Sequence, residues 1–125
     1  MPAMRNQGSG SIVNIASVVA VAGQPGYLHY VASKGAVLSM TREIAVIYAR
    51  QGIRANALCP GPVMTPMLAK FLSDDAKRQR RLVHIPMGRF GEPEEIGELV
   101  LFMCSDACTF MTADTVYVNG GGGWR

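Results

Sequence analysis

The chain has 125 residues, of which 49% are hydrophobic and 17% charged, and its formal net charge is +3. This length allows one domain at most with a buried core, and the composition excludes a disordered chain. The mild charge lacks the dense basic stripes of nucleic-acid proteins, and neither a signal peptide nor a run of about 20 apolar residues is present. We therefore expect no nucleic-acid partner, no membrane partner and a cytoplasmic location.

The first half of the chain predicts a helix end, a strand, a long helix and a second strand. Residues 1–8, MPAMRNQG, are typical of the end of a helix, and residues 11–17, SIVNIAS, predict a short strand rich in β-branched residues. Helical spacing predicts a helix from about residue 28 to residue 50, which Gly52 ends as a cap. Residues 53–61, IRANALCPG, predict the second strand. The apolar residues that we expect on a broad buried face of the long helix are Val31, Val37, Leu38, Met40, Ile44, Ala45 and Ile47.

The second half predicts short polar helices, an amphipathic helix and a last strand. Residues 66–84 predict one or two short helices with acids first and bases last, which suits the helix dipole. Residues 92–105, EPEEIGELVLFMCS, predict a helix that begins near Pro93, and residues 114–118, DTVYV, predict a strand that runs into NGGGGW. The inward stripe of this amphipathic helix is expected to contain Ile96, Leu99, Val100 and Met103. Strands alternating with helices indicate a parallel α/β sheet with crossover connections.

Two local patterns allow a second interpretation. The basic run KRQRR at residues 77–81 could bind nucleic acid, but it has no aromatic interleaving and favours a solvated helix end. Cys104 and Cys108 are one helical turn apart, so a metal pair is conceivable. No second Cys or His pair accompanies them at ligand spacing, and the odd count with Cys59 gives no disulfide framework. We expect structural thiols, buried or half-buried, and no metal site.

Three polar segments are expected at one edge of the sheet. Ser17 closes the first strand, and the segment that follows is long enough to fold back and place the next helix beside it. Tyr30 and Lys34 lie one turn apart on one face of that helix. The second strand delivers PGPVMT, residues 60–65, to the same edge. Ligands of doubly wound sheets bind at the carboxyl ends of strands, so this convergence predicts a site.

The motifs at this edge resemble one enzyme family. NIASV, then YVASK thirteen positions after the serine, then NALCPGPVMT and the late VNGG resemble the catalytic half of the short-chain dehydrogenase/reductase family. The resemblance covers about Gly8 to Gly122. It implies the C-terminal half of a Rossmann-type doubly wound parallel sheet, with about three contiguous strands and crossover helices. Residues 1–125 would then form a partial catalytic domain.

The resemblance implies a role for each residue at the edge. Tyr30 would be the acid/base that exchanges a proton with the substrate oxygen, because a nearby ammonium, that of Lys34, favours the ionised form of a phenol. Lys34 would also hold the ribose hydroxyls of NAD or NADP, and Ser17 would hydrogen-bond the substrate oxygen. Further cofactor-binding residues would be Pro60, Gly61, Val63 and Thr65, the backbone near Val63 binding the nicotinamide carboxamide.

Each of these residues also has an ordinary interpretation when taken alone. Ser17 could cap a backbone group, Tyr30 could be an aromatic residue at a helix start, and Lys34 could be solvated. His29 lies on another helix face and is interpreted as a wall residue of the cleft, whereas His84 is interpreted as structural.

The glycine-rich turn of the family's cofactor half has no counterpart in this sequence. GSG at residues 8–10 precedes a strand instead of opening a helix, and the family's upstream asparagine is also not found. We therefore expect about half of such an enzyme, with an apolar edge at strand 11–17 and an isolated chain that is unstable or associated.

Two function classes follow. The first is an NAD(P)-dependent oxidoreductase, or its catalytic fragment, acting on a small alcohol or ketone as a homo-oligomer. The second is an inactive remnant that serves as an interaction or oligomerisation module. A lipophilic substrate is expected from the apolar residues of the segment after the second strand, which are Met64, Met67, Leu68, Phe71 and Leu72.

Overall fold

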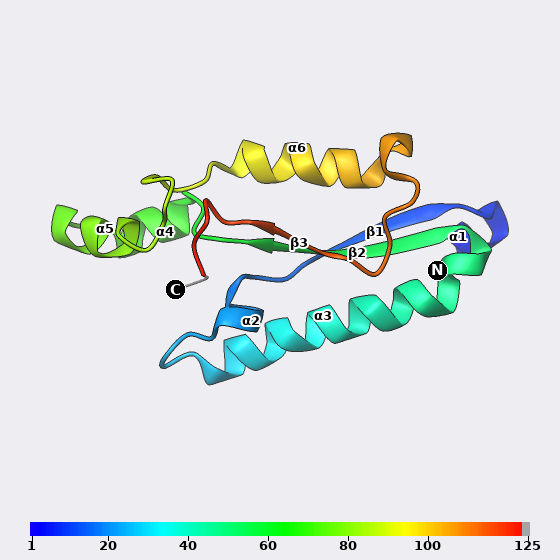
Figure 1. Ribbon diagram of the computed structural model, residues 1–125, viewed down its shortest axis with the longest axis horizontal. Coiled ribbons are helices and arrows are strands. Elements are labelled where there is room, and N and C mark those ends of the chain that lie inside the picture. Colours follow the sequence, from blue (N-terminus) through cyan, green and yellow to red (C-terminus); the bar gives the residue numbers. More distant parts are fainter. Residues whose placement is uncertain (124–125) are drawn as a thin grey trace.

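A three-stranded parallel sheet organises the chain. The computed structural model describes residues 1–123, and its strands β1 (Gly10–Ile15), β2 (Ile53–Pro60) and β3 (Thr115–Val118) lie in the order β1-β2-β3. Helix α3 (Leu28–Tyr48) lies on one face of the sheet with the short α2 (Val19–Ala22), and α6 (Pro93–Cys104) lies on the other (Figure 1). The predicted α/β class with contiguous strands and crossover helices is confirmed.

The central strand β2 carries the core. It pairs with β1 from Gly10↔Ile53 to Ile15↔Leu58 and with β3 from Ala57↔Thr115 to Pro60↔Val118, parallel in both cases. Its side chains from Ala55 to Cys59 are at most 1% exposed, as expected for a strand covered on both faces. β1 lies at the edge of this sheet, and its last residue, Ile15, is 45% exposed. The described residues thus contain the apolar edge that was predicted.

Helix α3 buries a narrower face than its apolar residues predicted. Leu38, Thr41 and Ala45 are buried against the sheet, and the Thr41 hydroxyl accepts a hydrogen bond of 2.9 Å from the Asn14 amide on β1. Met40 and Ile47, both predicted to be buried, are 50% and 52% exposed. The prediction was wrong for these two residues because the sheet contacts only one side of the helix, and the composition of the helix does not show which apolar residues lie outside.

The remaining elements agree with the expected order. α1 (Pro2–Gln7) ends at Gly8, and α3 continues through a 3-10 turn (Ala49–Gln51) to Gly52, whose φ of 74° is left-handed. The polar stretch forms two helices, α4 (Pro66–Phe71) and α5 (Asp75–Leu82), beyond the carboxyl end of β2 (Figure 1). A second 3-10 turn (Asp106–Cys108) follows α6, which begins at Pro93 as predicted. Trp124, the last letter of the NGGGGW stretch, lies outside the described residues.

The three cysteines are free thiols in different surroundings. Cys59 and Cys108 are buried, whereas Cys104 is exposed, so the expectation of buried or half-buried thiols was wrong for Cys104. Within residues 1–123, no three His, Cys, Asp or Glu side chains gather in a group that could hold a metal ion. In the same range, no helix combines the length and the apolar character needed to cross a bilayer.

Candidate active site

A cleft of about 560 Å³ opens at the carboxyl ends of β1 and β2. Its walls come from the end of β1, the first turns of α3, the loop after β2 and the helices that follow that loop. This one cleft is lined by all the predicted site residues, namely Ser17, Tyr30, Lys34, Pro60, Gly61, Val63 and Thr65. The topology therefore brings together residues that are up to 48 positions apart in the sequence.

Ser17 is held in place by a continuation of the β1–β2 ladder. The strand ends at Ile15, but the Ala16 N–H donates to the Leu58 carbonyl at 2.7 Å and the Val18 N–H to the Pro60 carbonyl at 3.2 Å. These two hydrogen bonds, one on either side of Ser17, fix its backbone. Its Oγ accepts only a long bond, 3.4 Å, from the Val19 N–H, so the hydroxyl proton remains available for a ligand oxygen.

Tyr30 and Lys34 stand together on the first two turns of α3. The Lys34 Nζ lies 5.7 Å from the centroid of the Tyr30 ring and donates to the Ile15 carbonyl at 2.9 Å. The carbonyl at the end of β1 therefore holds the ammonium between the strand and the ring. Tyr30 is 40% exposed and faces the cleft, where a ligand can reach it.

In the loop after β2, hydrogen bonds hold the residues before and after Val63, and the backbone groups of Val63 itself are unpaired. Gly91 donates its N–H to the Pro62 carbonyl at 3.0 Å and accepts from the Met64 N–H at 2.8 Å. These bonds flank Val63, whose own N–H and C=O make no hydrogen bond to any described residue. A free donor beside a free acceptor is the complement of an amide group.

The loop begins at a position that requires glycine, and it ends at Thr65, which caps the N-terminus of α4. The Gly61 N–H donates to the Val118 carbonyl at 2.8 Å, and a Cβ at Gly61 would lie 2.7 Å from the Asn119 Cα. Only glycine allows this close approach to the end of β3. The Thr65 Oγ1 accepts from the Leu68 N–H at 3.2 Å and so caps α4 while it lines the cleft.

Comparison with known proteins assigns this arrangement to a family. Residues 1–122 match the family described as enoyl-(acyl carrier protein) reductase, one of the short-chain dehydrogenase/reductase groups. The chain belongs to the short-chain dehydrogenase/reductase family. The family resemblance predicted from the sequence motifs is thereby confirmed.

The relatives match nearly all of this chain, but the chain spans only about half of their length. The chain is 42% identical over 121 residues to 3-oxoacyl-(acyl-carrier-protein) reductase FabG of Thermotoga maritima, covering 97% of this chain and 48% of that protein. It is also 42% identical over 122 residues to 2-(S)-hydroxypropyl-CoM dehydrogenase 3 of Xanthobacter autotrophicus, covering 94% and 48%. Among solved structures, gluconate 5-dehydrogenase of Burkholderia cenocepacia in complex with NADP and tartrate matches with a TM-score of 0.90 and 34% identity, over 96% of this chain and 47% of that one.

The short-chain dehydrogenase cleft includes polar residues that the sequence did not single out. Arg81 and Gln24 line it, and both also line an adjacent cavity of about 470 Å³ together with His84. Arg81 is exposed, as expected for a solvated helix end, and in addition lines both spaces, whereas the interpretation of His84 as structural stays a prediction. His29, expected as a wall residue, is exposed and lines neither space.

The apolar segment after β2 contributes less to the cleft than predicted. Met67 and Leu68 line it, whereas Phe71 on the same helix is 63% exposed and does not. Met64 and Leu72 are not among its lining residues either. Helix α4 is short and presents only its first turn to the cleft, which the residue types alone do not reveal.

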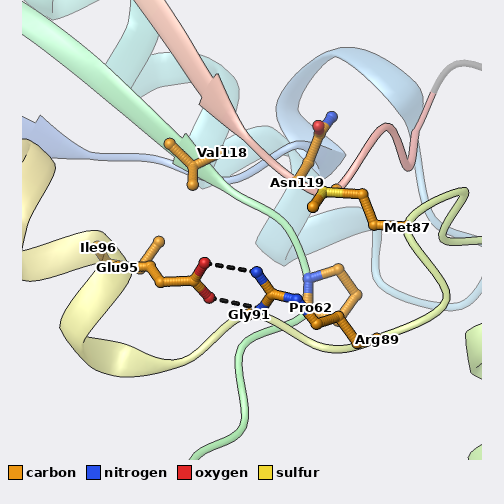
Figure 2. A pocket seen from close by; sticks show the side chains of 9 residues that line it. Pro62, Met87, Arg89, Gly91, Glu95, Ile96, Val118 and Asn119 are labelled. Atoms are coloured by element: carbon orange, nitrogen blue, oxygen red, sulfur yellow. Dashed lines mark hydrogen bonds and ion pairs between the residues drawn. The ribbon is translucent and has the colours of Figure 1, made fainter.

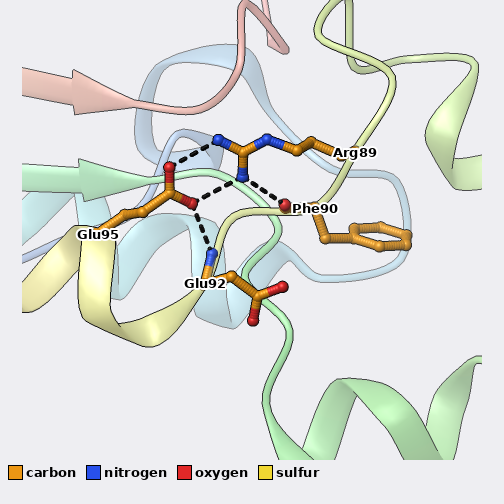
Figure 3. Close-up of polar contacts among 4 residues, drawn as sticks. All are labelled: Arg89, Phe90, Glu92 and Glu95. Carbon is orange, nitrogen blue, oxygen red and sulfur yellow. Dashed lines mark hydrogen bonds and ion pairs between the residues drawn. The ribbon is translucent and has the colours of Figure 1, made fainter.

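A small cavity of about 80 Å³ lies behind the loop, against the end of β3 (Figure 2). Arg89 and Glu95 meet there in a two-pronged ion pair of 2.7 and 2.8 Å. The Glu95 carboxylate also accepts from the Glu92 N–H at 2.8 Å, and Arg89 donates to the Phe90 carbonyl at 3.1 Å (Figure 3). This group fixes the start of α6 and, through Gly91, the loop that carries Val63.

A Glu95→Gln variant should remove one acid-dependent part of stability. Hydrogen bonds from Arg89, and then from the Glu92 N–H, lower the pKa of Glu95 from 4.5 to about 2. Because the folded-state pKa is the lower one, this stabilisation is present above pH 4.5 and is lost as the pH falls towards 2. The difference in unfolding free energy between wild type and variant should therefore shrink between these pH values, which urea titrations at several pH values would measure. The pKa of Asp74 is also lowered, by bonds from Lys77, but its effect is common to both proteins and cancels. A difference that stays constant with pH would contradict this account.

Proposed function

We propose that the chain is the catalytic half of an NAD(P)-dependent oxidoreductase that interconverts a secondary alcohol and a ketone. The observation that carries the proposal is the placement of Ser17, Tyr30 and Lys34 around one cleft, which the unpaired backbone of Val63 also lines. A hydroxyl that can donate, a phenol beside an ammonium and an amide-recognising backbone unit are the groups that this reaction needs at one place.

The proposed mechanism gives each side chain one task. In the oxidation direction, the Tyr30 phenolate takes the proton of the substrate hydroxyl while the hydride leaves the carbinol carbon. The Lys34 ammonium lies beside the Tyr30 ring, 5.7 Å from its centroid, and the Ser17 hydroxyl donates to the substrate oxygen as its charge develops. In the reduction direction the same proton returns from Tyr30 to the carbonyl oxygen. The nicotinamide cofactor, when bound, supplies or accepts the hydride.

The residues on the loop after β2 fit such a cofactor. The free N–H and C=O of Val63 match the acceptor and donor of a carboxamide, and the Thr65 hydroxyl retains its proton for a second contact. Lys34 would reach the ribose hydroxyls. Both NAD and NADP are retained as candidates; the related gluconate 5-dehydrogenase structure contains NADP.

A thermal melt of the purified chain with and without NAD(H) and NADP(H) tests this proposal. A ligand at a hundred times its dissociation constant adds about 2.7 kcal/mol to the folded state, which gives a clear rise in melting temperature. The same melt on a Val63→Pro variant, which removes the free N–H, should show no rise. If none of the four nucleotides changed the melting temperature of the wild-type chain, the result would contradict the proposed cofactor site.

A second candidate function is favoured by exposed apolar residues on α3. Val46 is 74% exposed, and Met40 and Ile47 are about half exposed, so the outer side of this helix could form a contact between copies of the chain. We include a homo-oligomer in the proposal, and an inactive interaction module as its alternative. Concentration-dependent sedimentation without any nucleotide effect would favour the module.

The three free thiols suit a reducing compartment such as the cytoplasm.

A further inference from the structure

The candidate active-site cleft adjoins a second cavity. The two spaces, of about 560 and 470 Å³, share the lining residues Val18, Val19, Gln24, Pro62 and Arg81. Ser17, Tyr30 and Lys34 line only the first space, whereas His84 lines only the second. A ligand whose reacting oxygen lies at Ser17 can therefore extend past Val18 and Pro62 towards Arg81 and His84.

The lining that the two spaces share carries a positive charge, that of Arg81. No Asp or Glu lines either space, and among the described residues Arg81 makes no ion pair or side-chain hydrogen bond. The Gln24 and His84 side chains have no hydrogen-bond partner in the same part of the chain. Three donor groups that lack an acceptor among the described residues thus line the adjacent cavity, and two of them, those of Gln24 and Arg81, also line the cleft.

The other basic residues of α5 already have contacts. Lys77 pairs with Asp74 at 3.2 Å, Arg78 lies 5.8 Å from the centre of the Phe90 ring, and the Arg80 Nε donates to the Ala76 carbonyl at 3.3 Å. Arg81 differs from them in lining the cleft and in having no such contact. The basic run of this helix therefore contributes one cation to the site and keeps the others on the surface.

We infer that the cleft takes an alcohol or ketone that carries an anionic group, a carboxylate or another oxyanion, at the end remote from the reacting oxygen. Arg81 binds that anion, and the Gln24 amide and the His84 ring N–H are additional donors. The apolar side chains between, such as Val18, Val19 and Leu68, contact the carbon part of the substrate. The inference rests on the proposed function for the reacting end, whereas the only charge that recognises the anion at its far end is that of Arg81.

Binding to the 125-residue chain without cofactor tests the inference separately from catalysis. The probes are para-acetylbenzoate, an aryl methyl ketone with a carboxylate, and its neutral methyl ester, each titrated by NMR. The acid should bind about tenfold more tightly than the ester, as expected for a charge-assisted contact at a partly exposed site, and the preference should fall with added salt. In Arg81→Met the acid should bind no better than the ester, whereas Arg81→Lys should keep part of the preference.

Arg80→Met is the matched control, because it removes the same charge from the same helix outside the cleft and should leave the preference intact. Unchanged melting temperatures would show that the variants fold. Equal binding of acid and ester to the wild type, or no binding of either, overturns the inference, as does a preference that survives in Arg81→Met. A loss of the NADP-induced melting shift in Arg81→Met would assign Arg81 to a cofactor phosphate and overturn the substrate assignment. A nucleotide shift that is absent in every variant would instead count against the proposed function.

Discussion

A Tyr30→Phe variant is expected to lose about 100- to 10,000-fold in kcat, the range that general acid–base catalysis contributes. The phenyl ring keeps the packing and the place of the ring beside the Lys34 Nζ, 5.7 Å away in the wild type, but it removes the only proposed proton carrier of the cleft. We would make the measurement on a longer chain, because this one spans about half the length of its relatives. A fusion of this chain behind the other half of the Thermotoga maritima relative would supply one, because the two proteins share 42% identity over nearly all of this chain.

Tyr27→Phe is the control for this experiment. Tyr27 is 48% exposed, lies just before α3 and does not line the cleft, so the loss of its hydroxyl should leave kcat unchanged. Both variants should melt like the parent fusion, because each removes one oxygen from a side chain that is at least 40% exposed. A Tyr30→Phe fusion with the parental rate would show that another group carries the proton.

The site was predictable from the sequence where it depends on strand ends and helix spacing. Ser17, Tyr30, Lys34 and the PGPVMT loop meet because parallel strands present their carboxyl ends at one edge, and a tyrosine and a lysine four residues apart share a helix face. Each of these relations is local or follows from the order of the elements. The contact between the Lys34 ammonium and the Ile15 carbonyl was not predictable in this way, since it depends on how closely α3 approaches β1.

Features that depend on the path of a loop or a short helix were not predictable. The direction of α5 decides that Arg81 lines the cleft and Arg80 does not, although the two are adjacent in a run of similar residues. A binding role for the backbone near Val63 was implied by the family resemblance, but the side-chain pattern does not show that this amide is unpaired, because every residue other than proline carries the same backbone groups. Only the two bonds to Gly91 show which amide stays unpaired. The exposed Met40 and Ile47 likewise depend on which side of α3 the sheet covers.

A Gly52→Ala variant is expected to lower the unfolding free energy by about 2–5 kcal/mol. The φ of Gly52 is +74°, and a residue with a Cβ loses about 1–2 kcal/mol there. The new Cβ would also lie 2.1 Å from the Gly8 carbonyl oxygen, and relief of such crowding costs about 1–3 kcal/mol. Gly52 accepts the Gly10 N–H at 3.2 Å at the start of the β1–β2 ladder, so the displacement would act on the pairing of the two strands that form the site.

Gly97→Ala separates this effect from a general consequence of replacing glycine. Gly97 lies within α6, and nothing lies within 4 Å of the position that its Cβ would take, so alanine should stabilise the protein by about 0.5–1 kcal/mol through helix propensity. Urea unfolding of the two variants, in the fusion if the chain alone does not unfold cooperatively, should therefore give shifts of opposite sign. Equal shifts for both would show that the turn at Gly52 can move away from Gly8 without disturbing β1. In that case the position of Ser17 after β1 would depend on the bonds that its neighbours Ala16 and Val18 donate to the Leu58 and Pro60 carbonyls, rather than on the turn where the two strands begin.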